Sequence, residues 1–293
     1  MKEEFVIHQG VLEKYSGESP VVRIPENVKS IGRLAFSECS FIKSVIIPDS
    51  VTAIGEKAFW SCDSLTSVNI PDSVTSIGAY AFDFCRSLAS ISIPDSVSSI
   101  GNSAFASCPS LTSITIPDGV QSIGARTFSE CTSLTSFRIP DSVTSIGKCA
   151  FMGCTSLASV TIPSSVASIG ESAFDGCYAL KSVTIPDSVT SIGKSAFYEC
   201  TSLTSVTIPE SVTSIGERAF EDCYNLISVT IPDSITALGD AVFVGCDKLD
   251  PLKIITPVFS QKIFPNHYKK SGYCQYCAGK LQNDQCTRCG REA

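Results

Sequence analysis

Residues 180–202, LKSVTIPDSVTSIGKSAFYECTS, contain one copy of a 23-residue unit that recurs along most of the chain. Its Ile-Pro pair occurs ten times, from Pro25 to Pro232, with no insertion or deletion between copies. Self-similarity at one fixed period is typical of a solenoid, in which each unit buries its apolar face only against its neighbours. The sequence therefore predicts one elongated body of ten stacked coils rather than two ordinary domains.

Each unit predicts two extended pieces. Apolar residues alternate with polar ones around Val183 and Ile185, which is the pattern of a strand with one polar face. Pro186 ends this strand because proline cannot donate a hydrogen bond to a neighbouring strand. A second extended piece, 189–192, ends at Gly193. Glycine occupies this position in all ten copies, which indicates either a positive φ or a close approach of backbones.

Stacked coils place equivalent residues above one another, about 4.8 Å apart. The ten phenylalanines from Phe36 to Phe243 are then predicted to form one buried column. The three-residue spacing of Ala196, Phe197 and Cys200 predicts a helical turn. We expect the ten repeat cysteines, from Cys39 to Cys246, to be buried, reduced thiols that act as small apolar residues. Cys149 lies outside this column, and we expect it to be exposed.

The two ends of the chain depart from the repeat. Residues 1–19 predict a β-hairpin, turning at Gln9-Gly10, that caps the first coil of a solenoid spanning residues 20–255. Residues 256–272 are predicted to be a linker, and residues 273–293 a small separate tail.

The tail contains two CxxC pairs, Cys274 with Cys277 and Cys286 with Cys289, eight residues apart. Four thiolates at this spacing can hold Zn²⁺ tetrahedrally, so the tail resembles a small zinc ribbon. Four protein ligands leave no open position for water, and we expect the zinc to be structural rather than catalytic. A pair of disulfides or a redox CxxC remains the alternative.

Charge is distributed unevenly. Residues 251–293 carry seven lysines and arginines against two acidic residues, a net charge of +5, whereas the whole chain carries −7 and residues 1–250 therefore −12. An acidic rod repels a phosphate backbone, so any nucleic-acid binding is predicted to reside in the tail.

Catalytic groups are scarce: the histidines are His8 and His267, and no nucleophile motif or glycine-rich phosphate loop is present. The sequence predicts a non-enzymatic protein. Candidate partner contacts are residues that interrupt the repeat. On the strand these are Arg23, Ile46, Asn69 and Arg138. On the helical-turn side they are the large aromatic residues Trp60, Tyr80 and Phe84, with Tyr178, Tyr198 and Tyr224 further along.

The pattern LxxVxIPxxVxxIGxxAFxxC over residues 20–250 resembles the BspA-like, or Treponema-type, leucine-rich repeat family. The resemblance implies a right-handed curved solenoid whose LxSVTIP strands form a parallel sheet on the concave face. Many relatives are bacterial or protozoan surface proteins that bind host or microbial partners. This chain differs from them in its cysteine-rich tail and in lacking a visible export signal.

These features predict a binding scaffold that contacts a protein partner through the solenoid surface. The alternatives are a nucleic-acid-associated protein acting through the tail and a bacterial cell-surface adhesin. The cysteines and the lack of a visible signal peptide favour a cytoplasmic location, with the cell surface or secretion as the alternative. No apolar run approaches the length needed to cross a membrane.

Overall fold

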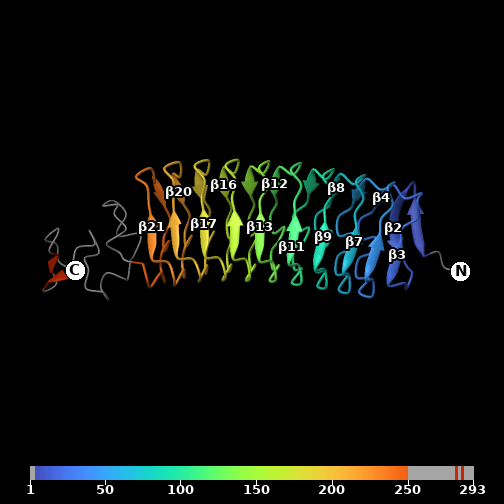
Figure 1. The fold of residues 1–293 in the computed structure, drawn as a ribbon, viewed down its shortest axis with the longest axis horizontal. Coiled ribbons are helices and arrows are strands. Elements are labelled where there is room, and N and C mark those ends of the chain that lie inside the picture. The colour runs from blue at the N-terminus through green and yellow to red at the C-terminus, as the bar shows by residue number, and fades with distance from the viewer. Residues whose placement is uncertain (1–3, 250–280, 283–284, 287–293) are drawn as a thin grey trace.

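The structure is a computed structural model that describes residues 4–249, 281–282 and 285–286. Figure 1 shows the coils side by side along the long axis of one elongated body, with the chain advancing from one end to the other. Ten coils follow one another without interruption, so the predicted solenoid is confirmed. We number the coils one to ten by their prolines, beginning with Pro25.

Each coil contributes one three-residue strand, and these strands stack in parallel to form the long-strand face. The pairing joins equivalent residues of successive coils, for example Val183 with Val206. The ladder runs as three sheets, β3-β5-β7, β9-β11 and β13-β15-β17-β19-β21. These strands are β3 Val21–Arg23, β5 Ser44–Ile46, β7 Ser67–Asn69, β9 Ser90–Ser92, β11 Ser113–Thr115, β13 Ser136–Arg138, β15 Ser159–Thr161, β17 Ser182–Thr184, β19 Ser205–Thr207 and β21 Ser228–Thr230.

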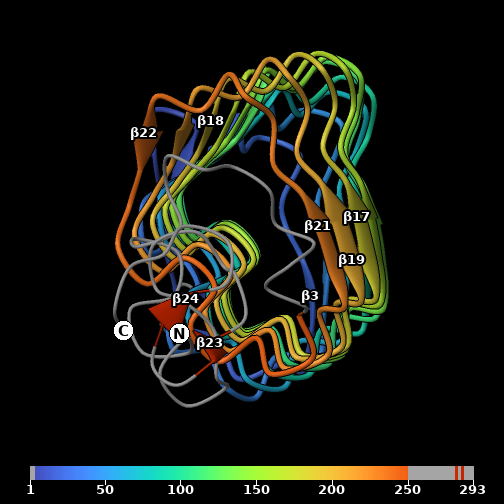
Figure 2. The ribbon, with the colours of Figure 1, turned by 90° about the vertical axis from the view of Figure 1, so that its left-hand side faces the viewer.

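A second, two-residue strand in each coil forms the opposite wall, and Figure 2 shows the two walls on either side of the coil. This ladder is continuous except between β10 and β12. Its strands are β4 Ser30–Ile31, β6 Ala53–Ile54, β8 Ser76–Ile77, β10 Ser99–Ile100, β12 Ser122–Ile123, β14 Ser145–Ile146, β16 Ser168–Ile169, β18 Ser191–Ile192, β20 Ser214–Ile215 and β22 Ala237–Leu238.

The third side of each coil, which we call the turn face, follows the recurring glycine and includes residues 194–202 in coil eight. The prediction of a helical turn here was wrong, because the segment is a run of turns. Amide N–H groups alternate in direction. Those of Ser195, Phe197 and Glu199 donate to carbonyls of the next coil at 2.8–2.9 Å, while those between them donate three residues back at 3.1–3.3 Å.

This alternation requires two left-handed residues in every coil. In coil eight they are Ser195 and Glu199, with φ of 53° and 54°. The equivalent positions have positive φ in all ten coils, and glycine takes the second of them only at Gly153, Gly176 and Gly245. The chain therefore adopts a left-handed backbone at residues that are mostly not glycine. Each left-handed residue directs an amide N–H to the neighbouring coil.

The glycine that occurs in every copy serves a different purpose. Gly193 does not have a positive φ, but a Cβ atom there would lie 2.6 Å from the backbone nitrogen of Glu171 and from the carbonyl carbon of Gly170. Of the two explanations that the sequence left open, close approach is therefore the correct one.

The core of the solenoid is a column of phenylalanine rings. All ten, from Phe36 to Phe243, are fully buried, and successive rings stack with centroids 5.0–5.8 Å apart. Tyr15 and Phe5 extend the column at its N-terminal end, with centroids 5.3 Å and 5.2 Å from the next ring. The predicted buried column is confirmed.

The predicted N-terminal hairpin is also confirmed, as β1 Phe5–His8 pairs antiparallel with β2 Val11–Tyr15. It covers only one of the two ladders, because β2 pairs in parallel with β4. The strand β3 begins the other ladder, and within the described part of the chain β5 is its one pairing partner.

Two glycine-to-alanine variants separate close approach from backbone conformation. Gly193→Ala places a Cβ against the backbone of the preceding coil. In Gly176→Ala the atom nearest to the new Cβ is 3.7 Å away, so the only cost is that of placing alanine at a φ of 69°, about 1–2 kcal/mol. We expect Gly193→Ala to lower the free energy of unfolding more, as measured by urea denaturation followed by circular dichroism. The reverse order would contradict the assignment.

Candidate partner-binding surface

Aromatic side chains from coils two and three gather on the turn face. The ring centroids of Trp60 and Phe84 lie 6.2 Å apart in an edge-to-face arrangement. Tyr80 is exposed, with 37% of its surface accessible. Trp60 and Phe84 are half-buried. The three aromatic residues that interrupt the repeat are therefore brought close together by coil stacking.

Two cations lie over these rings. The Lys57 Nζ is 5.3 Å from the centroid of Tyr80 and 5.9 Å from that of Trp60. The Arg86 guanidinium carbon is 5.6 Å from the centroid of Phe84. Each such contact is worth about 0.5–1 kcal/mol at an exposed site. We call Lys57, Trp60, Tyr80, Phe84 and Arg86 the aromatic patch.

A buried carboxylate supports this patch. The Trp60 indole Nε1–H donates to Asp83 Oδ2 at 3.2 Å, and Asp83 is only 6% exposed. Burial raises the pKa of Asp83 to about 6, against the smaller opposing effects of the Trp60 hydrogen bond and the Lys57 charge. Asp83 therefore changes charge near neutral pH while bonded to the tryptophan.

The backbone beneath two of the rings is left-handed, with φ of 57° at Tyr80 and 61° at Phe84. A bulky side chain is an uncommon choice for this conformation. Other coils place serine or glycine at the same positions, such as Ser107 and Gly153 in the column of Phe84. The aromatic residues are thus not required by the local fold, which is the pattern expected of a functional surface.

The strand candidates lie on a different side of the coil. Arg23, Ile46 and Asn69 are directly paired on β3, β5 and β7, so they form one continuous row. Arg138 lies on β13, outside this row, and its Nη2 is 3.3 Å from Asp141 Oδ2. The structure therefore groups three of the four strand candidates and separates the fourth.

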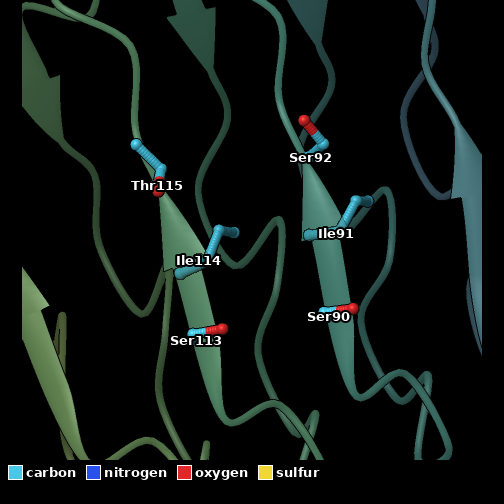
Figure 3. A pocket seen from close by; sticks show the side chains of 6 residues that line it. All are labelled: Ser90, Ile91, Ser92, Ser113, Ile114 and Thr115. Carbon is cyan, nitrogen blue, oxygen red and sulfur yellow. The ribbon is translucent and has the colours of Figure 1, made fainter.

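Two hollows lie on the strand walls. One has a volume of about 240 Å³ and lies over β9 and β11, and Figure 3 shows the six side chains that line it: Ser90, Ile91, Ser92, Ser113, Ile114 and Thr115. The other, of about 660 Å³, lies over β18, β20 and β22. Neither is lined by a titratable side chain, so what these two hollows can offer is hydroxyl, backbone and apolar contact.

The cysteine column is part of the core. From Cys62 to Cys246, each thiol S–H donates to the carbonyl of the phenylalanine in the preceding coil, with Sγ–O distances of 3.1–3.3 Å. Burial raises the pKa of the Cys131 thiol to about 12 and that of Cys200 well above its usual value. All ten repeat thiols are free, as predicted, and nine of them are buried, whereas Cys39 is only half-buried. Buried thiols with a raised pKa are poor nucleophiles.

Cys149 is also free but only 4% exposed, so the expectation of exposure was wrong. It occupies a left-handed position on the turn face, with φ 55°, and its side chain is covered there although it lies outside the column.

The predicted zinc ligands lie outside the residues whose side chains are described. In that region the structure describes only a short antiparallel pair, β23 Leu281–Gln282 with β24 Gln285–Cys286. Within residues 4–249 no group of three or more metal-ligating side chains occurs. The predicted linker, 256–272, is likewise outside the described residues. Among the described residues, no helix is long and apolar enough to cross a membrane.

The BspA type leucine rich repeat region family matches residues 14–135 and 121–250. The chain belongs to this family. The match begins at the end of β2 and spans all ten coils, so the BspA-type repeat accounts for the whole solenoid. No curated protein matches the chain.

Several solved structures are similar to this BspA-type protein. A leucine-rich repeat protein from Bacteroides ovatus is 27% identical, with 85% of this chain and 90% of that one covered and a TM-score of 0.46. A leucine rich cell surface protein from Faecalibacterium prausnitzii is 29% identical, with 84% and 91% covered and a TM-score of 0.41. The pneumococcal vaccine antigen PcpA is 23% identical, with 82% and 73% covered and a TM-score of 0.60, which shows a shared fold.

Lys57, Asp83 and Arg86 of the aromatic patch were not predicted from the sequence. Asp83 carried a usable signal, because its column contains Trp60 one coil earlier and the indole N–H of a tryptophan needs an acceptor when it is covered. Lys57 and Arg86 gave no such signal, because charged residues are common on an exposed turn face.

Trp60 is the only tryptophan in the protein, so its fluorescence reports on Asp83 directly. We expect the emission to change between pH 4 and 8 with a midpoint near 6, where Asp83 ionises. Because its folded pKa lies above its ordinary value of 3.8, Asp83 contributes stability that is complete below pH 3.8 and is lost as the pH rises through about 6.

The variant Asp83→Asn should abolish the transition in fluorescence. Asp175→Asn is the matched control, since Asp175 occupies the same column four coils away, and it should leave the transition unchanged. A transition that persists in Asp83→Asn would contradict the assignment.

Proposed function

We propose that this protein is a non-enzymatic scaffold that binds a protein partner through its three N-terminal coils. The observation that carries the proposal is the aromatic patch, where three rings and two cations from two coils meet. Tyr80 is exposed, Trp60 and Phe84 are half-buried, and the left-handed backbone at Tyr80 and Phe84 does not need an aromatic residue. Interfaces take much of their energy from a few aromatic and arginine side chains surrounded by weaker contacts.

The row Arg23, Ile46 and Asn69 belongs to the same three coils on the long-strand face. Later coils return to the repeat at these positions, with threonine at Thr161, Thr184, Thr207 and Thr230. Coils one to three thus depart from the repeat on both the turn face and the long-strand face, which supports an N-terminal binding region. Arg138 is better explained by its ion pair with Asp141.

We also propose that the four tail cysteines, Cys274, Cys277, Cys286 and Cys289, hold one structural Zn²⁺. The support is their spacing, together with the strand pair β23–β24, which in sequence lies between Cys277 and Cys289. In this proposal the tail is a second contact point rather than a catalytic centre.

For location, we propose a reducing compartment such as the cytoplasm. The support is that every cysteine from Cys39 to Cys246 is free. Surface adhesion remains the alternative, and fractionation of the native cell distinguishes the two. The nucleic-acid alternative depends on the basic tail, and salt-dependent binding of DNA or RNA to the full chain would favour it over the protein scaffold.

The proposed binding region is tested with the double variant Trp60→Ala, Phe84→Ala. Alanine fits the column of Trp60, since Ala106 already occupies it two coils later, so the fold should be retained. We expect photo-crosslinking in the native cell to capture a protein partner with the wild type and not with the variant. Binding should weaken at least tenfold, because an aromatic side chain at the centre of an interface typically contributes about 1–2 kcal/mol.

Met152→Ala is the control, because Met152 lies in the column of Trp60 four coils away, and it should retain the partner. If the double variant and the control both bind as the wild type does, the aromatic patch is not the binding surface.

The zinc proposal predicts about one Zn²⁺ per chain by elemental analysis of the purified protein. Cys277→Ser with Cys289→Ser should abolish it, and Cys200→Ser should not, because Cys200 is buried in the solenoid core. Retention of zinc after loss of both tail thiols would rule the site out.

A further inference from the structure

A second aromatic surface lies on the turn face near the C-terminal end of the solenoid. Tyr178 in coil seven and Tyr224 in coil nine occupy the same column and are each 44% exposed. In coil eight this column has the smaller residue Thr201. The two tyrosines are therefore two coils, or about 10 Å, apart, with a short side chain between them. Tyr198 precedes Thr201 in coil eight.

Carboxylates surround these rings. The Tyr178 hydroxyl donates to Glu199 Oε2 at 3.2 Å. A hydrogen bond to Glu199 raises the pKa of Tyr198 to about 12, and the charge of Asp222 raises the pKa of Tyr224. We call Tyr178, Tyr198, Glu199, Asp222 and Tyr224 the tyrosine patch.

The neighbouring cations do not neutralise this patch. Lys194 Nζ lies 2.9 Å from Glu217. The Arg218 Nε lies 3.2 Å from Glu217 and 3.4 Å from Glu221. Within residues 4–249 no ion pair reaches Glu199 or Asp222.

The two surfaces differ in where their cations come from. In the aromatic patch the chain supplies its own, Lys57 and Arg86, over the rings. The tyrosine patch also places rings beside carboxylates, but among the described residues no cation lies over its rings. What it lacks is a lysine or arginine side chain, which a ring and a carboxylate bind together.

We propose that the tyrosine patch is the docking surface for the basic C-terminal stretch of this same chain, residues 253–291. That stretch contains Lys253, Lys262, Lys269, Lys270, Lys280, Arg288 and Arg291, and residues 251–293 carry a net charge of +5 against −12 for the rest. Charge complementarity therefore selects the chain's own end as the occupant.

The distances allow this contact. Coil ten, where the described solenoid ends at Leu249, is three coils from Tyr178, or about 14 Å at the spacing of stacked strands. Twelve residues beyond that point span up to about 40 Å when extended. A covalently attached ligand also acts at an effective concentration on the order of millimolar, so weak individual contacts suffice.

Docking would also occupy the positive charges of the tail. Nucleic acid would then compete with the tyrosine patch for the same lysines and arginines. The inference does not rest on the aromatic patch, so each can fail without the other.

Zero-length carbodiimide crosslinking of the full chain tests the proposal, because it joins a carboxylate to a lysine amine only when the two are in contact. We expect crosslinks from Glu199 or Asp222 to tail lysines, mapped by mass spectrometry within the monomer. The double variant Tyr178→Ser, Tyr224→Ser should reduce their yield roughly tenfold, and raised salt should suppress them. Tyr80→Ser, an exposed tyrosine of the aromatic patch, is the control and should leave the yield unchanged.

Three results would overturn the proposal. The first is tail crosslinks spread equally over other exposed carboxylates such as Asp49, Asp72 and Asp95. The second is tail crosslinks found only in covalent dimers, which would make a second copy the occupant. The third is no crosslink to the patch at all.

Discussion

The structure depends on contact between the backbones of successive coils at the glycine column. A Cβ at Gly193 would lie 2.6 Å from the backbone of the preceding coil, so only glycine lets the coils stack at the spacing of a strand ladder. At this spacing the phenylalanine rings lie 5.0–5.8 Å apart, and the cysteine thiols reach the carbonyls one coil back. The exception is Gly124, where the nearest atom to an added Cβ is the Asn102 side-chain oxygen, and there the ladder of two-residue strands is interrupted between β10 and β12.

This arrangement separates the interior from the exterior. Every coil repeats the residues that build the stack, so they cannot distinguish one partner from another. The outward positions are free to vary, and they vary unevenly. Coils two and three carry rings with their own cations. In coils seven to nine, Tyr178 and Tyr224 lie beside Glu199 and Asp222, which make no ion pair within residues 4–249. Two chemically opposite surfaces thus occur on the same side of one rod.

Periodicity alone was enough to predict the ten coils, the column of buried phenylalanines from Phe36 to Phe243 and the free thiols, and alternating residues predicted the N-terminal hairpin. The prediction failed on the turn face, where three-residue spacing at Ala196, Phe197 and Cys200 suggested a helix. The same spacing arises from consecutive turns whose left-handed residues, such as Ser195 and Glu199, are mostly not glycine and so carry no sequence signal. The aromatic residues of the candidate site were found because they interrupt the repeat. Lys57 and Asp83 were not, because their importance depends on which neighbours the stack brings to them.

The most direct test of this account deletes one unit and compares it with a deletion that is one residue shorter. Removal of residues 180–202, one whole unit, should leave a shorter solenoid with the same circular dichroism spectrum per residue and cooperative thermal unfolding. Removal of residues 180–201 should disrupt both, because it shifts every glycine and phenylalanine of the later coils out of their columns. If the two deletions unfold alike and both retain the spectrum, stacking in register is not what holds the molecule together.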